Sequence, residues 1–352
     1  MKALILIGGQ GTRLRPFTLN RCKCLLPLVN RPLITYQLAL LKRFGFKEVV
    51  LAANASQPGL SEITRLGKEF SLSVKLSLEK SPLGTAGAIR NAAPFFKKEK
   101  AILVFNGDFV ADFNLERIIA LHQERNPVAT IILAKVRNPS SYGLVVMDER
   151  GTIRKFVEKP APEEIVADTI NAGVYLLSQE AINFIPAKKN VSIERETFPS
   201  LLTSGQDLCG YIHYGYWLDV GSIESFIQAT RDILDGRLSR EFLLPVKEEK
   251  ILPGVKIEGQ AIVAPGSLVK PGAILRGHVV IGPGCYVDQD CLLEEAVLFE
   301  QVSIKKGSVV QRSLVGRESI LGSNARLTGS VLADGSYVGD FSCLGETKFS
   351  EQ

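Results

Sequence analysis

A loop near the start of the chain combines residue types that hold phosphate groups. The stretch GGQGTRLRPFTLNRCKC contains three glycines within four positions, followed by Arg13, Arg15 and Lys23. Glycine lets backbone N–H groups approach an anion closely, and guanidinium groups bind phosphate oxygens through charged hydrogen bonds. The dinucleotide-binding pattern is broken because Leu14 stands where its third glycine should fall, and no Gly-Lys-Ser/Thr sequence follows. These residues favour a polyphosphate-binding loop of unassigned type over a structural turn.

Two aspartates end strand-like segments that lie far apart in the sequence. Asp108 ends AILVFNGD and Asp219 ends YWLD. Ligands of doubly wound sheets bind at the carboxyl ends of the strands, so both positions are candidates for a binding site. A lone aspartate after a strand is more often a turn residue or a helix cap, and position alone leaves that alternative open.

The segments that would position these residues alternate in type from residue 1 to about 235. Apolar, strand-like runs occupy residues 3–7, 48–53, 74–79, 101–108 and 129–136. Apolar residues recur at helical spacing in residues 33–44, 85–96 and 115–125, with Asn114 placed to cap the last of these. This alternation predicts βαβ units and an α/β fold with a doubly wound, mainly parallel sheet.

The periodicity changes after about residue 250. Aliphatic residues then recur every six positions, except for single steps of five after Val287, Val310 and Leu327. The positions are Ile251, Ile257, Val263, Val269, Leu275, Ile281, Val287, Leu292, Leu298, Ile304, Val310, Val315, Leu321, Leu327, Leu332 and Val338. A period of six is typical of hexapeptide repeats, in which each inward aliphatic residue stacks on its equivalent one coil away. The sequence therefore predicts two domains, with residues 1–238 forming the α/β domain and residues 239–352 a left-handed parallel β-helix.

A coil of this kind needs neighbours to cover its ends, so we expect it to mediate homo-oligomerisation. Some hexapeptide helices are acyltransferases that use a histidine base. His278 is the one histidine in this part of the chain, and no acyl-donor site is apparent near it. An assembly role is therefore preferred over acyl transfer.

Composition excludes several classes of protein. The net charge of +5 is too small and too dispersed to indicate binding to nucleic acid or to a membrane surface. No apolar run approaches the ~20 residues that span a bilayer, and the N-terminus lacks the pattern of a signal peptide. Six scattered cysteines are typical of reduced thiols in the cytoplasm, and the Cys22–Cys24 pair, with no further ligand nearby, is a poor zinc site.

Six motifs in order resemble those of one enzyme family, the nucleotide-sugar pyrophosphorylases (sugar-1-phosphate nucleotidyltransferases). The opening loop is similar to the family pattern G-G-x-G-T-R-L-x-P-x-T. It is followed by SPLGTAGAI, FNGD, YGLVVMDERGTIRKFVEKP, NAGVYLL and YWLDVGSIESF. The resemblance covers residues 1 to about 235, and hexapeptide tails are common in the family. It implies that a sugar-1-phosphate oxygen attacks the α-phosphate of a nucleoside triphosphate and that pyrophosphate leaves.

The resemblance also implies roles for individual residues. Arg13 and Lys23 are expected to act in catalysis on the triphosphate, and Asp108 and Asp219 to bind Mg²⁺. Two carboxylates suit this ion, and without a cation they would repel each other. The implied nucleotide-binding residues are Gly8, Gly9, Gly11, Thr12, Gly84 and Thr85. The implied sugar-phosphate-binding residues are Gly143, Glu158, Lys159 and Asn171. Without this context, an adjacent glutamate and lysine would be interpreted as a solvated surface pair.

The chain departs from the family pattern beside the loop lysine. Prolines usually flank this lysine, whereas Cys22 and Cys24 flank Lys23 here. Proline stiffens a loop, so we expect a functional but less rigid segment. Redox control through the two thiols is the alternative to a simple packing substitution.

The substrate branch rests on FVEKP, NAGVYLL, SIERETFP and YWLDVG. Together these segments most resemble the guanylyltransferases that act on mannose-1-phosphate, which implies conversion of GTP and mannose-1-phosphate to GDP-mannose. Thymidylyl-, uridylyl- and adenylyltransferases acting on glucose-1-phosphate share most of the motifs. A non-catalytic regulatory or scaffold member of the family is a further alternative, against which the four residues Arg13, Lys23, Asp108 and Asp219 argue.

Overall fold

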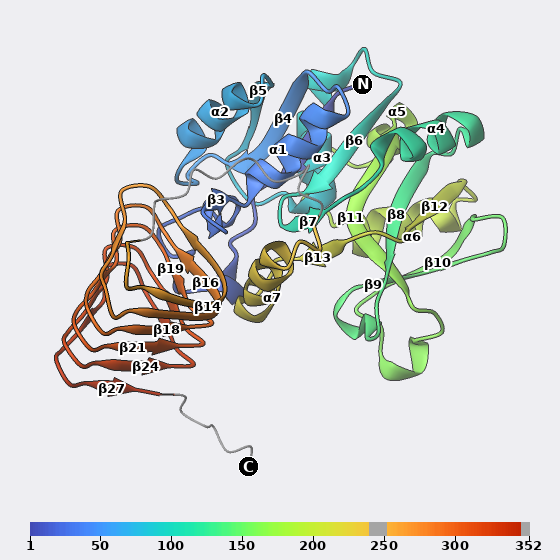
Figure 1. The fold of residues 1–352 in the computed structure, drawn as a ribbon. Coiled ribbons are helices and arrows are strands. Elements are labelled where there is room, and N and C mark those ends of the chain that lie inside the picture. The colour runs from blue at the N-terminus through green and yellow to red at the C-terminus, as the bar shows by residue number, and fades with distance from the viewer. Residues whose placement is uncertain (239–251, 346–352) are drawn as a thin grey trace. The chain divides into compact units, whose positions relative to one another are not determined.

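A computed structural model describes residues 1–238 and 252–345 (Figure 1). The chain forms two compact units. Unit 1 comprises Met1–Gln10, Cys22–Leu25 and Leu33–Val220, and unit 2 comprises Gly11–Arg21, Leu26–Pro32 and the described residues from Gly221 onward. Two short pieces of the N-terminal loop region therefore belong to the unit that contains the β-helix. The proposed domain boundary between residues 238 and 239 remains a prediction.

Unit 1 is built on a nine-stranded sheet whose central strands are parallel. Strand β1 (Ala3–Leu6) lies between β4 (Glu48–Asn54) and β6 (Ala101–Asn106), and β5 (Ser73–Glu79) pairs with β4. Residues of β1 and β6 are buried on both faces, as expected for parallel strands covered by helices. These strands confirm the predicted α/β class.

The other half of the same sheet contains antiparallel pairs. Strand β11 (Thr169–Ser178) runs antiparallel to β6, and β8, β9 and β10 extend the sheet beyond it, with β12 parallel to β8. These strands span Ala129–Lys135 (β8), Gly143–Met147 (β9), Ile153–Glu158 (β10) and Leu208–His213 (β12). A separate pair is formed by β7 (Phe109–Ala111) and β13 (Trp217–Asp219).

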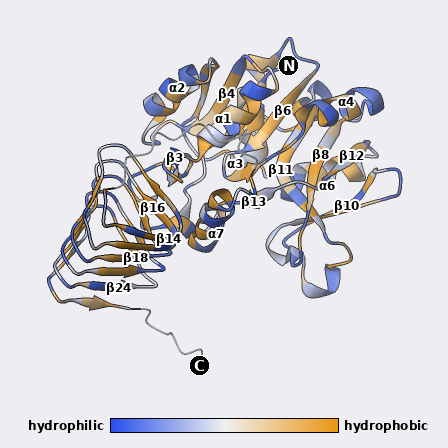
Figure 2. Cartoon of the chain, viewed as in Figure 1, coloured by the Kyte–Doolittle hydropathy of each residue, from blue (hydrophilic) through white to orange (hydrophobic). Residues whose placement is uncertain are grey.

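Helices flank the sheet of unit 1, and hydrophilic and hydrophobic residues alternate along several of them (Figure 2). They are α1 (Ile34–Arg43), α2 (Leu60–Glu69), α3 (Gly84–Ala92), α4 (Leu115–Arg125), α5 (Gln179–Phe184) and α6 (Phe198–Thr203). The predicted cap is confirmed, because the Asn114 side chain accepts a hydrogen bond from the backbone N–H of Arg117. None of the described helices is long and apolar enough to cross a membrane.

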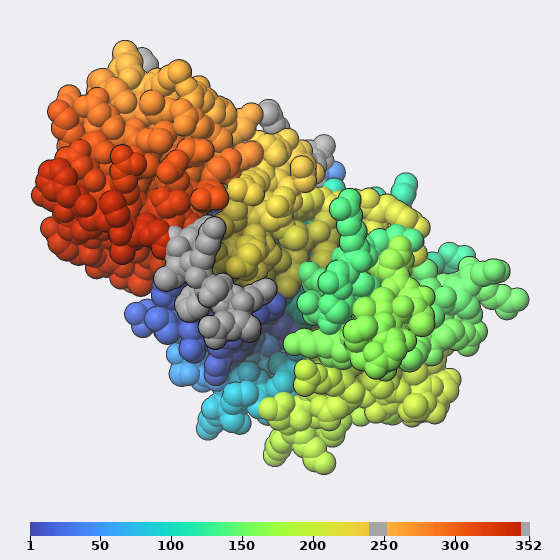
Figure 3. Space-filling view, turned by 90° about the horizontal axis from the view of Figure 1, so that it is seen from below, coloured from blue at the N-terminus to red at the C-terminus, as the bar shows by residue number. Residues whose placement is uncertain are grey.

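Unit 2 contains a parallel β-helix. Its short strands pair in parallel with strands 17 or 18 positions later, such as Val269 with Val287 and Leu298 with Val315. They are β14 (Lys256–Val263), β15 (Leu268–Val269), β16 (Ile274–Ile281), β17 (Tyr286–Val287), β18 (Leu292–Glu294), β19 (Val297–Leu298), β20 (Ser303–Ile304), β21 (Val309–Gln311), β22 (Leu314–Val315), β23 (Ile320–Leu321), β24 (Arg326–Thr328), β25 (Val331–Leu332), β26 (Tyr337–Val338) and β27 (Cys343–Leu344). The coils form a continuous outer surface, coloured orange to red in Figure 3.

Most of the predicted inward residues form the core of this helix. Twelve of them are buried: Val263, Val269, Leu275, Ile281, Val287, Leu298, Ile304, Val310, Val315, Leu321, Leu327 and Val338. The prediction for Leu292 is wrong, because Leu293 is the buried residue and the step of five follows it. Ile257 is 43% exposed, since it lies in the first described coil with no described coil before it, and Leu332 is only partly buried. Ile251 lies outside the described residues.

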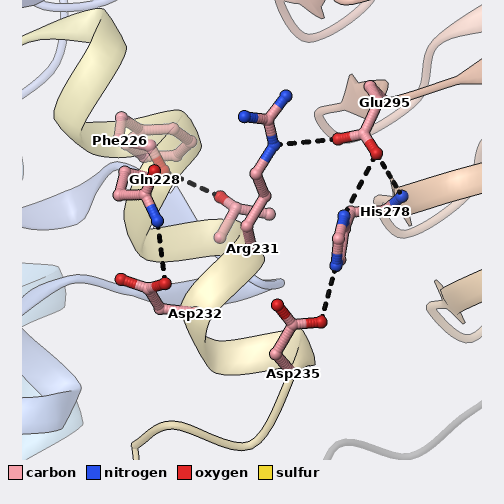
Figure 4. A network of polar contacts seen from close by, with 8 residues as sticks. Phe226, Gln228, Arg231, Asp232, Asp235, His278 and Glu295 are labelled. Atoms are coloured by element: carbon pink, nitrogen blue, oxygen red, sulfur yellow. Dashed lines mark hydrogen bonds and ion pairs between the residues drawn. The ribbon is translucent and has the colours of Figure 1, made fainter.

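Unit 2 also includes helix α7 (Ile223–Leu234) and a polar network on the β-helix that faces it (Figure 4). Arg231 Nε donates to Glu295 at 2.9 Å, and His278 contacts both Glu295 and Asp235, the latter at 2.7 Å. Burial by itself lowers the pKa of His278, but the hydrogen bonds to Asp235 and Glu295 outweigh it and raise that pKa. His278 therefore joins helix α7 to the β-helix, which accounts for it without a role in acyl transfer.

Candidate active site

A pocket of about 280 Å³ lies at the carboxyl ends of the parallel strands of unit 1. It is lined by residues in β1, β4, β5 and β6, by residues that follow these strands, and by the first part of α3: Leu6, Gly8, Gly9, Ala52, Glu79, Pro82, Gly84, Thr85, Ala88, Asn106 and Asp108. Five of the residues named from the sequence, Gly8, Gly9, Gly84, Thr85 and Asp108, thus meet at one site. This is the edge at which an open α/β sheet binds its ligands.

Gly84 cannot be replaced by a larger residue without rearrangement of the pocket wall. Its φ is +70°, and a Cβ atom there would lie 2.5 Å from the backbone oxygen of Val191. Gly8 is less constrained, because its Cβ would lie 2.9 Å from Oε1 of Glu79, which is the end of a side chain that can move. The glycines therefore allow a close approach of backbone to ligand and to neighbouring side chains.

Lys23 and Asp108 form an ion pair at the pocket. Lys23 begins a short turn, Lys23–Leu25, and its Nζ lies 2.8 Å from Oδ2 of Asp108. The lysine side chain is only 12% exposed, whereas the aspartate side chain is 37% exposed. A cation and a carboxylate of the pocket lining, from segments 85 positions apart, are thus held together.

The backbone brings the second predicted aspartate next to the first. Strands β13 and β7 pair so that Asp219 is opposite Phe109, the residue after Asp108. The N–H of Val220 donates to the backbone oxygen of Asp108 at 2.7 Å. Antiparallel pairing of β7 and β13 therefore brings the backbones of Asp108 and Asp219 close together, although the two residues are far apart in the sequence.

The oxygen atoms near this point fit a hard cation such as Mg²⁺. Asp108 carries a carboxylate in the pocket lining and Asp219 another on the neighbouring strand, and Asn106 lines the pocket with a buried amide Oδ1 that accepts no hydrogen bond from the described residues. No group of three or more His, Cys, Asp or Glu side chains gathers in residues 1–238 or 252–345. Mg²⁺ is commonly held by one or two carboxylates while water and substrate phosphates complete its octahedron, so this donor set suits it.

The two cysteines beside Lys23 are buried and contact each other. Their Sγ atoms are 2.9 Å apart, and Gln57 Nε2 donates to Cys22 Sγ at 2.5 Å. The hydrogen bond from Cys24 lowers the pKa of Cys22, whereas that same bond together with burial raises the pKa of Cys24. Both side chains are less than 5% exposed, so the pair packs into the interior behind the lysine.

Thr85 connects the pocket to a polar network that includes Asn171. The Thr85 hydroxyl donates to Glu194 at 2.7 Å, and Glu194 also lies 3.4 Å from the hydroxyl of Tyr175. Asn171 Nδ2 donates to that hydroxyl at 2.7 Å. Sequence reasoning missed Glu194, although it lies within SIERETFP, one of the segments that suggested the substrate branch.

The other predicted sugar-site residues lie on the neighbouring antiparallel strands. Gly143 pairs with Glu158 across β9 and β10, and a Cβ at Gly143 would lie 3.0 Å from Oε2 of that glutamate. Burial, followed by the nearby charge of Glu194, raises the pKa of Glu158. Lys159 follows directly with a φ of +52°, and its N–H donates to the backbone oxygen of Tyr142. Glu158 is therefore half-buried and differs from a solvated surface residue.

Three predicted nucleotide-loop residues belong to unit 2. Gly11 has a φ of +59° and precedes the short helix Thr12–Leu14, which contains Arg13. The hydroxyl of Thr18 donates to the backbone oxygen of Gly11 at 2.7 Å and closes the loop. Leu14, which breaks the dinucleotide pattern, is fully buried and anchors this short helix.

Glu79 is a pocket residue that the sequence did not single out. It ends strand β5 and is 9% exposed, and its Oε2 accepts a hydrogen bond from the N–H of Leu83 at 3.3 Å. Burial raises the pKa of this carboxyl group, while the bond from Leu83 opposes the change. The sequence signal that could have identified it is its position at the end of a parallel strand, five residues before Gly84.

Comparisons with known proteins agree with this arrangement. The family model described as "Nucleotidyl transferase" matches residues 2–236. The chain belongs to the nucleotidyl transferase family. A second model, described as "GMPPB C-terminal domain", matches residues 257–349 of this family member. The predicted family is therefore confirmed over both halves of the chain.

Curated relatives in the family cover most of this chain. It is 38% identical to the mannose-1-phosphate guanyltransferase of Kluyveromyces lactis over 75% of this chain and 73% of that protein. The corresponding enzyme of Saccharomyces cerevisiae is 37% identical over 75% of this chain and 72% of its own length. Among solved structures, HddC from Yersinia pseudotuberculosis complexed with GMP-PN is 24% identical and has a TM-score of 0.57, over 66% of this chain and 99% of that one. This last similarity supports the fold.

Proposed function

We propose that this protein transfers a guanylyl group from GTP to mannose-1-phosphate, giving GDP-mannose and pyrophosphate. The observation that carries the proposal is the Lys23–Asp108 pair, 2.8 Å long, beside a glycine-lined pocket at the carboxyl ends of parallel strands. The two yeast relatives are mannose-1-phosphate guanyltransferases, and they supply the choice of substrates in this proposal.

The substrate brings its own nucleophile to this reaction. A phosphate oxygen of mannose-1-phosphate attacks the α-phosphorus of GTP, the bond to the β-phosphate oxygen breaks, and pyrophosphate leaves with the electron pair. Catalysis then depends on alignment and on neutralising negative charge, for which the protein supplies fixed cations. In this proposal Lys23 binds the α-phosphate, Arg13 binds the triphosphate, and the N–H groups at Gly8, Gly9, Gly11 and Thr12 approach its oxygens.

Mg²⁺ is the proposed cofactor. Asp108 and Asp219 would hold it, and when bound it would supply positive charge against the phosphate oxygens. Lys23 pairs with Asp108 in the structure described here, so its ammonium group compensates the charge of that carboxylate. Lys23 thus serves two roles in the proposal, as a partner of the metal ligand and as a contact of the reacting phosphate.

Glu79 supports guanine as the base. Guanine carries the donor groups N1–H and N2–H₂ side by side, and one carboxylate can accept from both. Adenine presents a ring acceptor at the corresponding position, which a carboxylate would repel. In the proposal, Gly84 and Thr85 bind the rest of the nucleoside, next to Glu79 in the pocket lining.

The sugar phosphate is proposed to bind beyond Thr85. Glu158 would accept hydrogen bonds from sugar hydroxyls, Lys159 would bind the phosphate, and Asn171 would contact the sugar through its amide. The backbone of Gly143 lies against Glu158 and completes this group. Glu194 bonds to Thr85 and approaches Tyr175, which links the proposed nucleotide and sugar sites.

Release of pyrophosphate from a matrix of nucleoside triphosphates and sugar-1-phosphates tests the proposal. With Mg²⁺ present, we expect the highest kcat/KM for GTP with mannose-1-phosphate. Faster turnover of dTTP, UTP or ATP with glucose-1-phosphate would assign the chain to another branch. No release from any pair would instead favour a regulatory or scaffold member of the family.

Assembly and location complete the proposal. A β-helix needs its ends covered, so we propose homo-oligomerisation through residues 239–352. All six cysteines carry free thiols, which fits the reducing environment of the cytoplasm. Sedimentation of the full-length protein, compared with a chain truncated near residue 240, tests the assembly. An unchanged subunit number after truncation would contradict it.

A further inference from the structure

The lysine of the proposed active site is carried between two segments that pack with the β-helix. Lys23 lies in the four-residue segment Cys22–Leu25 of unit 1. The segments on either side, Gly11–Arg21 and Leu26–Pro32, both belong to unit 2. The chain therefore passes from unit 2 to the lysine and back to unit 2 within a few residues.

Arg21 ties the first of these segments to the β-helix. Its Nη2 lies 2.7 Å from Oε1 of Glu300 and 3.6 Å from Oδ2 of Asp334, and its side chain is 12% exposed. The guanidinium carbon also lies 5.9 Å from the ring centre of Phe299. An arginine held by two carboxylates and an aromatic ring loses much of its freedom, and the backbone at residue 21 is restrained with it.

An aromatic cluster anchors the same segment through Phe17. The ring centre of Phe17 lies 4.7 Å from that of Phe299, which in turn lies 6.1 Å from that of Phe226 on helix α7. All three rings are no more than 3% exposed. Phe299 of the β-helix therefore contacts the loop segment and α7 in one buried cluster.

The second segment is attached by a hydrogen bond from Asn30. This residue lies between β2 (Pro27–Leu28) and β3 (Arg31–Pro32), and its Nδ2 donates to the backbone oxygen of Ile281 at 2.9 Å. Ile281 is a buried core residue of the β-helix. The chain on both sides of Cys22–Leu25 is thus bonded to the β-helix, through Arg21 before it and Asn30 after it.

From these contacts we infer that the β-helix holds the catalytic loop in position, and that Arg21, with Glu300 and Asp334, is a positioning group for Lys23. The Cα atoms of residues 21 and 23 can be at most about 7 Å apart, so a shift at Arg21 is transmitted directly to the lysine. Misplacement of a catalytic group by about 1 Å can cost about 100-fold in rate. This inference rests on the proposed function and adds a role for the β-helix beyond assembly.

Steady-state kinetics of GDP-mannose formation tests the inference in the full-length protein. Arg21→Ala and the double variant Glu300→Gln/Asp334→Asn should each lower kcat on the order of tenfold to 100-fold, with KM values changed less than about threefold. Arg21→Lys retains a charge for the carboxylates and should recover much of the rate. Combining Arg21→Ala with the double variant should lower kcat no further, because either change alone already disrupts the contacts of Arg21 with the two carboxylates.

Glu258→Gln is the matched control. Glu258 also lies on the β-helix and accepts from Arg276 Nε at 2.7 Å, but it contacts neither loop segment. We expect its kcat to equal that of the unmodified protein. Full activity of Arg21→Ala would overturn the inference. A loss in Arg21→Ala without one in Glu300→Gln/Asp334→Asn would also overturn it, because Arg21 would then act directly on substrate.

Hydrogen exchange separates this inference from the proposed function. Amide exchange over residues 11–32 should be faster in Glu300→Gln/Asp334→Asn than in the unmodified protein, with or without turnover. If no substrate pair is converted but exchange rises, the proposed function fails while the anchoring stands. Unchanged exchange in that variant would refute the anchoring, whatever the activity.

Discussion

The β-helix and the sheet of unit 1 differ in how apolar and polar residues are distributed along their strands. In the β-helix, equivalent buried positions repeat along the coil, as at Leu293, Val310 and Leu327, and charged side chains pair between coils, as Lys270 does with Asp288. In the sheet of unit 1, strands β1, β4 and β6 are apolar over most of their length, and polar residues line the pocket where strands end, as at Glu79 and Asp108. Successive coils of the β-helix repeat the same kinds of position. The sheet instead has one edge at which residues of different chemical type lie close together and form the pocket.

The first test of this comparison removes a charged group from the pocket edge of the unit 1 sheet. Asp108→Asn should reduce kcat by about 1,000-fold or more, because it removes a proposed Mg²⁺ ligand and the partner of Lys23. Pyrophosphate release measures the loss. Asp288→Asn, which breaks a pair with Lys270 on the β-helix, serves as the control and should leave kcat unchanged. Equal activity of the two variants would mean that Asp108 is the wrong carboxylate.

A second test asks whether Glu79 makes the pocket bind guanine in preference to adenine. Glu79→Gln should lower kcat/KM for GTP by about 10- to 100-fold, because an amide can accept from only one of the two guanine donors. The value for ATP should fall much less, so the ratio between the two nucleotides is the quantity to measure. An unchanged ratio would remove Glu79 from base recognition.

A third test concerns the register of the coil. Leu293→Ala should lower the free energy of unfolding by about 2–5 kcal/mol, since Leu293 is fully buried in the core of the β-helix. Leu292→Ala, one position earlier and only partly buried, should cost less than about 1 kcal/mol. Urea denaturation of the pair measures the difference. The reverse order would restore the register that the sequence suggested.

The smallest effect is expected at the network that joins α7 to the β-helix. The pKa of His278 is raised, so its folded value lies above the unfolded value of about 6.5. Its contribution to stability is therefore complete below pH 6.5 and is lost as the pH rises through the folded pKa. His278→Gln should lower the melting temperature by about 1–2 °C at pH 6 and by less at pH 9, since the network is partly exposed. A larger loss at pH 9 would contradict the assigned direction.

Local sequence predicted the regular elements well. The strands of residues 48–53 and 129–136 and the cap at Asn114 follow from apolar periodicity and one side chain, and both are local properties. The error at Leu292 shows the limit of this reasoning. Two adjacent leucines fit the period equally well, and the choice between them depends on which one is buried inside the coil, where Leu293 is in register with Leu275.

The site was predicted in part, because its motifs are contiguous stretches. Gly84, Thr85 and Asp108 were named from short motifs and line one pocket in the structure. Glu79 and Glu194 were missed, since a single glutamate among many carries no local signal. Their position becomes informative only when β5 and the segment after Val191 are placed against the pocket and Thr85.

Sequence by itself determined the family, the two kinds of architecture and most of the residues proposed for catalysis, because each of these depends on spacing within a short stretch. Only the tertiary structure decided that Lys23 meets Asp108 and that the segments around this lysine pack with the β-helix. Such contacts join residues separated by many positions, as Arg21 and Glu300 are. The tertiary fold decides which charged residues pair with one another. Composition and periodicity do not predict these pairs.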